Sequence, residues 1–387
     1  MRALSRAGRR LRIAVCAAAL VAGTGVVGAA PAQAVEEITT QDYVSVLGID
    51  KAVARGLTGT GVRIGVIDGP ADTDLPELEG ANVRVRKMCD FDGSDRSRTH
   101  GSAMASILSA RGYGVARGAE VVNYSFPRRR LGDGEDDTVN DAKGCLGIGM
   151  EETLDAAVAE GMQIISISLG GGELSESLRD ALVRALAKNV IVVVSTGNEG
   201  REDPEDSLAS LNGVVGVGSS DNQGLIWRYS NFGKGLTVLA PGENLKVHDF
   251  ASGEVVSVTG TSVATPIVAG ALAVAMQQWP QAAPNQILQS LVGTATNGRG
   301  GFPLLSTGGL DRTDPTGYPD ANPLMDKFAG EEPSAASVAD CTDGLSSRDS
   351  FFKADEAYVY RGVDPEVVDK HPGQSALGTS PRYHRQD

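Results

Sequence analysis

Short runs of consecutive apolar, β-branched residues alternate along this chain with segments of helical periodicity, which narrows the possible folds more than any other feature. Three of the runs are Val62–Asp68, Met162–Leu169 and Val190–Asn198. Helical spacing occupies 150–161 and 175–189 between them. Strands that are apolar throughout are buried on both faces, and an intervening helix returns the chain so that successive strands lie parallel. The sequence therefore predicts an α/β fold, a doubly wound, mostly parallel sheet with helices on both faces.

The two ends of the chain differ in composition from this central part. Residues 1–34 are basic, then apolar, and end in Ala-Gln-Ala, a pattern typical of a secretory signal peptide cleaved after Ala34. A membrane anchor is the weaker alternative, because Gly and Thr interrupt the apolar run. Residues 42–327 are predicted to form the folded domain and the polar residues 328–387 a flexible tail. No later run is long and apolar enough to cross a membrane, so we expect a secreted, extracellular protein.

Charge and cysteine content exclude several classes of function. The formal net charge is −14, and loss of the arginine-rich residues 1–34 makes the mature chain more acidic still, so nucleic acid should be repelled. Cys89 and Cys145 both fall in the folded region and are the expected disulfide, which leaves Cys341 as a thiol. No His/Cys spacing suggests zinc, and no metal site is predicted.

Polar side chains stand where a parallel sheet would bring them together. Asp68 and Asn198 end apolar runs, and Ser262 follows the strand-like EVVSVTGT and opens a long apolar segment. The carboxyl ends of parallel strands meet at one edge, which is where ligands bind. His100 is the one histidine at a predicted helix start flanked by Gly and Ser. Asp68, His100 and Ser262 therefore supply acid, base and nucleophile, although Ser262 could instead be a helix cap.

The segments around these residues resemble a known family. VRIGVIDGP, HGSAMAS and GTSVATPIVAG resemble the three signature blocks of the subtilisin-like serine proteases, the subtilases of peptidase family S8, in the family's order Asp, His, Ser. ISISLGGG, VVVSTGNEG and YSNFGKGLTVLAPGE match the intervening landmarks, so the resemblance runs from Asp42 to Lys327. It implies a monomeric serine endopeptidase that binds polypeptides in extended form and requires no cofactor. Calcium sites are common in the family, yet no ligand set can be assigned here.

The resemblance also implies a role for each residue. Ser262 attacks the scissile carbonyl, His100 takes its proton, and a buried Asp68 orients the imidazole. Asn198 donates its side-chain amide to the oxyanion, together with the backbone N–H of Ser262. The strand edge that holds the substrate is formed by Ser168, Leu169 and Gly170. Glu199 is expected near the rim of the S1 pocket, where an acid would favour a basic P1 residue.

The chain departs from the family pattern at several points. Gly69 stands where Thr or Ser is more usual, and Ala103 where many members have a second His. The interval between Ala34 and Asp68 leaves no room for the folding prosegment that subtilases usually carry. Either the domain folds unaided, or something else holds it inactive, for which the polar tail and a chaperone in trans are the candidates.

Two other functions are compatible with parts of the pattern. A catalytically silent subtilase fold would bind peptides without cleaving them, and an intact set of Asp68, His100, Asn198 and Ser262 argues against it. An α/β-hydrolase esterase predicts a G-x-S-x-G elbow and the order Ser, Asp, His, neither of which is found.

Overall fold

The computed structural model describes residues 35–127, 137–139, 145, 147–169, 174–203, 207–325 and 327. The predicted signal peptide, the tail 328–387 with Cys341, and Gly170 lie outside the described residues. The predictions for these segments therefore stay predictions.

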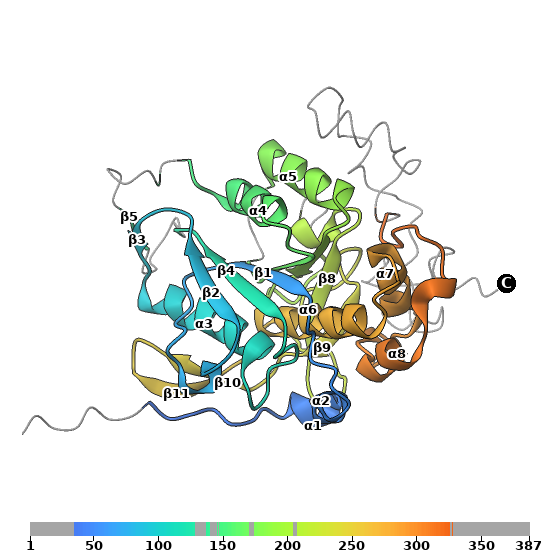
Figure 1. Cartoon of the computed structure of the whole chain (residues 1–387), viewed down its shortest axis with the longest axis horizontal. Coiled ribbons are helices and arrows are strands. Elements are labelled where there is room, and N and C mark those ends of the chain that lie inside the picture. The colour runs from blue at the N-terminus through green and yellow to red at the C-terminus, as the bar shows by residue number, and fades with distance from the viewer. Residues whose placement is uncertain are drawn as a thin grey trace, which may run out of the picture. The chain divides into compact units, whose positions relative to one another are not determined.

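A nine-stranded sheet forms the centre of the described domain (Figure 1). Its order from one edge to the other is β12 (Thr296–Asn297), β13 (Pro303–Leu304), β9 (Val238–Pro241), β8 (Val215–Ser220), β7 (Ile191–Ser195), β6 (Ile164–Ile167), β1 (Arg63–Asp68), β4 (Glu120–Ser125) and β2 (Val83–Lys87). Only β12 and β13 pair antiparallel within this sheet; all its other neighbours are parallel. The predicted mostly parallel sheet is confirmed.

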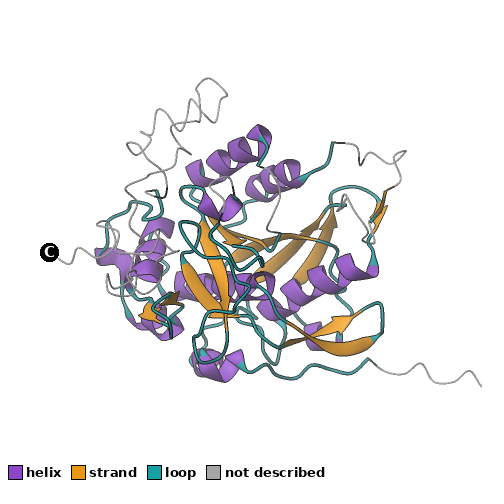
Figure 2. Ribbon diagram, turned by 180° about the vertical axis from the view of Figure 1, so that it is seen from behind, coloured by secondary structure: helices purple, strands orange, loops and turns teal. Residues whose placement is uncertain are grey.

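Helices cover both faces of this sheet, as the apolar strands require (Figures 1 and 2). α3 (Asp95–Ser109) and α6 (Thr261–Gln278) pack on one face, and α4 (Met150–Ala159) and α5 (Glu176–Ala187) on the other. Side chains alternate between the two layers because successive strand residues point to opposite faces. In β1, for example, Val66 faces α3 and α6, whereas Ile67 faces α4 and α5.

The remaining elements are short and lie around these layers. They are α1 (Tyr43–Val46), α2 (Ile49–Ala54), η1 (Pro76–Leu78), β3 (Phe91–Asp92), β5 (Thr138–Val139), η3 (Leu208–Ser210), β10 (Leu245–Asp249), β11 (Glu254–Val258), α7 (Pro284–Gly293), α8 (Thr307–Arg312) and η4 (Pro315–Gly317). The strand predicted before Ser262 exists as β11, but it pairs antiparallel with β10 in a separate hairpin. The expectation that this strand belongs to the main sheet is wrong.

Capping side chains fix where two of the helices begin. The Ser94 hydroxyl accepts a hydrogen bond from the N–H of Ser97, so α3 starts five residues before the predicted helix at His100. Ser175 does the same for α5 by accepting from the N–H of Leu178. His100 therefore lies in the second turn of a longer helix.

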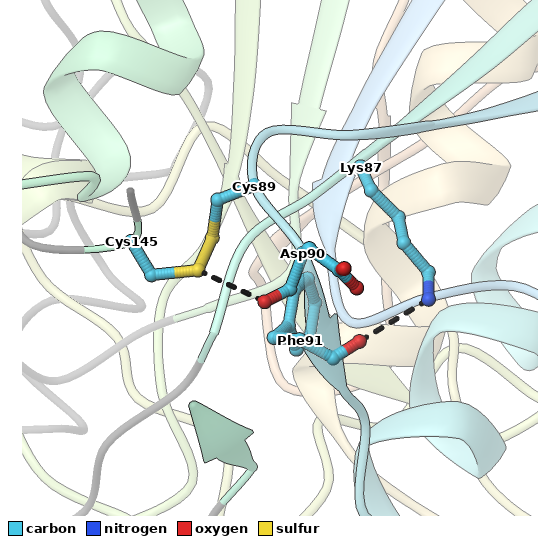
Figure 3. Close-up of a disulfide and its surroundings, with 5 residues drawn as sticks. All are labelled: Lys87, Cys89, Asp90, Phe91 and Cys145. Carbon is cyan, nitrogen blue, oxygen red and sulfur yellow. Dashed lines mark hydrogen bonds between the residues drawn. A yellow bond between two sulfur atoms is a disulfide. The ribbon is translucent and has the colours of Figure 1, made fainter. Parts of the chain in front are cut away.

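A disulfide joins Cys89 to Cys145, as predicted, with Cα atoms 5.3 Å apart (Figure 3). It links the segment after β2 to the end of the charged loop 127–145, of which only part is described. Beside it, Lys87 Nζ donates a 3.1 Å hydrogen bond to the carbonyl of Phe91. The loop closed by the disulfide contains the whole of α3 and so restrains the helix that carries His100.

Candidate active site

Asp68 and His100 form a direct hydrogen bond where β1 ends against α3. The Asp68 side chain is fully buried, and its Oδ1 lies 2.7 Å from His100 Nδ1 and also accepts the N–H of Gly69 at 2.7 Å. A carboxylate can only accept, so Nδ1 carries the proton of this hydrogen bond. In a neutral imidazole this leaves Nε2 as an acceptor, which is the arrangement a general base requires.

Two glycines allow β1 and α3 to approach this closely. A Cβ atom at Gly69 would clash with the hydroxyl and carbonyl oxygens of Ser97, and one at Gly101 would clash with the carbonyl of Gly69. The absence of a side chain at Gly69, unusual for the signature block, therefore follows from the packing of α3. The other carboxylate oxygen of Asp68, Oδ2, is buried with no hydrogen-bond partner among the described residues.

Ser262 is the second residue of α6, and it does not cap that helix. The N-cap is Gly260, which makes no side-chain cap hydrogen bond. Pro266 lies four residues after Ser262 and has no N–H, so it cannot donate to the Ser262 carbonyl as an ordinary helical residue would. The Ser168 hydroxyl donates to that carbonyl instead, at 2.8 Å. The proline thus gives the end of β6 a fixed contact with the start of α6.

Asn198 is oriented by the residue before Ser262. It lies three positions after the end of β7 rather than on the strand itself, which corrects the predicted position. Its Oδ1 accepts from both the N–H and the hydroxyl of Thr261, at 2.9 and 3.0 Å. The amide nitrogen Nδ2 is thereby left as the donor. A carbon in the side-chain position of Gly260 would lie 3.4 Å from Ser262 Oγ and 3.5 Å from Asn198 Nδ2, so these two atoms flank one space.

These side chains surround a cavity of about 460 Å³. Five of the predicted site residues line it: His100, Ser168, Leu169, Asn198 and Ser262. Asp68 lies behind His100 and does not line the cavity, and Gly170 is outside the described residues. Glu199 also lines it, and its Oε2 accepts a 2.6 Å hydrogen bond from Asn231 Nδ2.

Part of the cavity wall was not predicted. Arg96 and Thr99 line the cavity from α3, and Val247 and Val258 line it from the β10–β11 hairpin. Arg96 precedes His100 by four residues, so helical spacing was a usable signal for it. No sequence pattern predicted that the β10–β11 hairpin would line the cavity, because its position depends on contacts between residues far apart in the sequence.

A network at the tip of the hairpin ties it to the turn of α3 that carries His100. The Thr99 hydroxyl donates to Asp249 Oδ1 at 3.4 Å and accepts the N–H of Phe250 at 2.9 Å. The Arg98 guanidinium lies 4.5 Å from the centre of the Phe250 ring. The pKa of Asp249 is lowered mainly by its hydrogen bond from the Ser252 hydroxyl. The two hydrogen bonds of the Thr99 hydroxyl, to Asp249 and from Phe250, therefore join the hairpin tip to α3.

Residues 59–312 match the profile of the Subtilase family, Peptidase_S8. The chain belongs to the subtilase family. It is 31% identical to subtilisin BL of Lederbergia lenta over 246 residues, which covers 63% of this chain and 86% of that protein. It is 28% identical to subtilisin DY of Bacillus licheniformis over 254 residues, covering 64% and 88%. The solved self-cleaved protease domain of PatA aligns with a TM-score of 0.53 and 25% identity, covering 66% of this chain and 97% of that one.

This subtilase is a serine-type endopeptidase. Within the described ranges, none of its helices is both long and apolar enough to cross a membrane. The same part of the chain has no group of three or more His, Cys, Asp or Glu side chains that could hold a metal ion.

Proposed function

We propose that this subtilase is a secreted endopeptidase in which Ser262, His100 and Asp68 form the catalytic triad. The observation that carries the proposal is the 2.7 Å hydrogen bond between His100 Nδ1 and a fully buried Asp68, beside a cavity that Ser262 and His100 both line. Such a carboxylate holds the imidazole in one tautomer and stabilises the imidazolium that forms when Nε2 takes a proton.

Acylation follows from this arrangement. Ser262 Oγ forms a bond to the scissile carbonyl carbon while its proton passes to His100 Nε2, and the carbonyl π electrons move to the oxygen. The tetrahedral intermediate then collapses, His100 returns the proton to the leaving amine, and the acyl-enzyme remains on Ser262. A water molecule then attacks the acyl-enzyme carbonyl carbon while His100 Nε2 takes its proton. The second tetrahedral intermediate collapses, His100 returns the proton to Ser262 Oγ, and the acid is released.

The oxyanion of that intermediate needs donors that are already in place. We assign this role to Asn198 Nδ2 and the backbone N–H of Ser262, at the start of α6 where unpaired N–H groups point outward. The two hydrogen bonds from Thr261 to Asn198 Oδ1 support the assignment, because they fix the amide with Nδ2 free to donate.

The substrate is proposed to be an extended polypeptide that pairs with the backbone of Ser168, Leu169 and Gly170. Ser168 contributes its backbone here, since its hydroxyl is used by the Ser262 carbonyl. The proposed reaction requires no cofactor and only one copy of the chain. Secretion is supported by the sequence of residues 1–34 and by the Cys89–Cys145 disulfide, a bond that persists in oxidising compartments.

Hydrolysis of a fluorogenic peptide library by the mature chain tests the proposal. Ser262→Ala and His100→Ala should each lower kcat by about 10⁶, as is known for the related subtilisins, and the double variant should be no slower than either. Asp68→Asn should lose less, about 10⁴. Folding of each variant is verified by circular dichroism. Activity that persists in a folded His100→Ala variant would contradict the proposed base.

The catalytically silent alternative is not favoured, because the aligned relatives are proteases. It predicts peptide binding by the wild type without turnover, which the same assay separates from the proposal.

A further inference from the structure

Arg96 is a positively charged residue of the cavity wall whose charge is not neutralised by a neighbouring acid. It lies in α3, four residues before His100, it lines the same cavity, and it is exposed. Among the described residues, no acidic side chain lies within ion-pair distance of its guanidinium, whereas Arg98 in the next turn pairs with Asp72 at 3.4 Å and with Asp95 at 3.9 Å. The donors of the Arg96 guanidinium are therefore available to a ligand in the cavity.

The acids nearest to this wall already have partners. Glu199 is the one acidic residue that lines the cavity in the described part of the chain, and its Oε2 accepts a 2.6 Å hydrogen bond from Asn231. Asp249, at the tip of the hairpin, accepts a 2.6 Å hydrogen bond from the Ser252 hydroxyl. A substrate carboxylate can supply the negative charge that the described residues do not give to Arg96, because a guanidinium binds a carboxylate through two parallel hydrogen bonds.

The spacing between Arg96 and His100 indicates which substrate residue would be bound. Four residues of an α-helix span about 6 Å along its axis. An extended peptide advances about 3.3 Å per residue, so the same 6 Å corresponds to about two substrate residues. His100 acts at the scissile bond, and the carboxylate that reaches Arg96 therefore belongs to a residue about two positions away from that bond.

We propose that Arg96 is a specificity-determining residue of this protease, and that it binds an Asp or Glu side chain of the substrate at P2 or P2′. The chain as a whole is acidic, with a formal net charge of −14, so an acidic substrate is repelled at long range and Arg96 supplies a local attraction. The inference rests on the proposed function, because it takes the cavity as the place where the polypeptide is cleaved.

The test compares fluorogenic peptides of one neutral sequence in which each position from P3 to P3′ is in turn Asp or Asn. The wild type should cleave the Asp peptide with about 5-fold higher kcat/KM than the Asn peptide at P2 or P2′. Arg96→Gln should abolish this ratio, and Arg96→Glu should invert it. Arg312→Gln, which removes an exposed arginine of α8 that does not line the cavity, should keep it. Because the ratio compares two substrates on one variant, partial misfolding of a variant does not change it.

The same ratio should fall towards 1 when NaCl is raised to about 1 M, because an exposed ion pair is screened at that ionic strength. The absence of an Asp preference at every position in the wild type would overturn the proposal, and so would a preference that survives in Arg96→Gln. If the wild type cleaves none of the peptides, the catalytic proposal fails instead.

Binding then still tests the role of Arg96. Fluorescence anisotropy of the labelled peptides should show about 5-fold tighter binding of the Asp peptide than of the Asn peptide to Ser262→Ala, and equal binding to Ser262→Ala/Arg96→Gln. Equal binding of the two peptides to Ser262→Ala would overturn the inference even where the catalytic proposal holds.

Discussion

The hydrogen bond between Ser168 and Ser262 gives the most specific test of how the site is built. The bond exists because Pro266 cannot donate to the Ser262 carbonyl, so removing the Ser168 hydroxyl leaves that carbonyl without either partner. Ser168 is 5% exposed, and the cost of an unpaired buried carbonyl is about 1–3 kcal/mol. Since the bond is only part-buried, we expect Ser168→Ala to lower the free energy of unfolding by about 1–2 kcal/mol.

The matched control is Ser166→Ala on the same strand. Ser166 is fully buried and its hydroxyl has no hydrogen-bond partner among the described residues, so its loss should change stability little. Both variants are measured by urea unfolding in the Ser262→Ala background, with the carbonyl of residue 262 unchanged.

The Pro266→Ala variant tests whether the carbonyl of residue 262 depends on Ser168 because the proline has no N–H. Alanine restores the N–H that can donate to the carbonyl of residue 262, so the carbonyl no longer depends on Ser168. In this background Ser168→Ala should lower the free energy of unfolding by less than it does with Pro266 present. The double-mutant cycle should give a coupling energy of about 1 kcal/mol. Equal costs of Ser168→Ala with and without the proline would refute the account.

Four further predictions concern the same region. Asn198→Ala should lower kcat by about 10²–10³ with little change in KM, the range known for an oxyanion donor in subtilisin; a larger effect on KM would assign Asn198 to substrate binding instead. Gly101→Ala should lower Tm by several degrees because its methyl group clashes with Gly69 O, whereas Gly317→Ala, with open space around it, should not. Cys145→Ser should cost about 4 kcal/mol of stability by the loop-entropy model, measured by urea unfolding, and should make Tm insensitive to dithiothreitol. In a P1 peptide panel, Glu199→Gln should weaken any preference for Lys or Arg over Leu or Phe; no such preference in the wild type would refute the role of this acid.

The main elements of the fold were predictable because their signals are local. Apolar β-branched runs fix the strands of a doubly covered sheet, and the spacing of 150–161 and 175–189 fixes α4 and α5. Helix starts were less predictable, since α3 begins at a serine cap upstream of its apolar part. The strand at 254–258 was predicted as a strand, but its pairing with β10 was not, because pairing depends on tertiary contacts.

The residues of the candidate site were predictable from polar positions close to strand and helix ends, although Asn198 lies three residues beyond β7 and His100 lies in the second turn of α3. The structure places most of the predicted residues around one cavity. Their supporting contacts were not predictable. The sequence contains Pro266 and Ser168 ninety-eight positions apart, and only the fold joins them through the carbonyl of Ser262. Lys327 likewise reads as an ordinary surface lysine at the domain's end, whereas the structure buries it completely.

The central claim is that Ser262 is activated by His100 and Asp68. Labelling of the mature protein with a fluorophosphonate probe at neutral pH tests it most directly, because only an activated serine reacts at a useful rate. We predict labelling of the wild type, with none of Ser262→Ala or His100→Ala. A folded wild type that remains unlabelled, both as the full mature chain and as residues 35–327, would contradict the account.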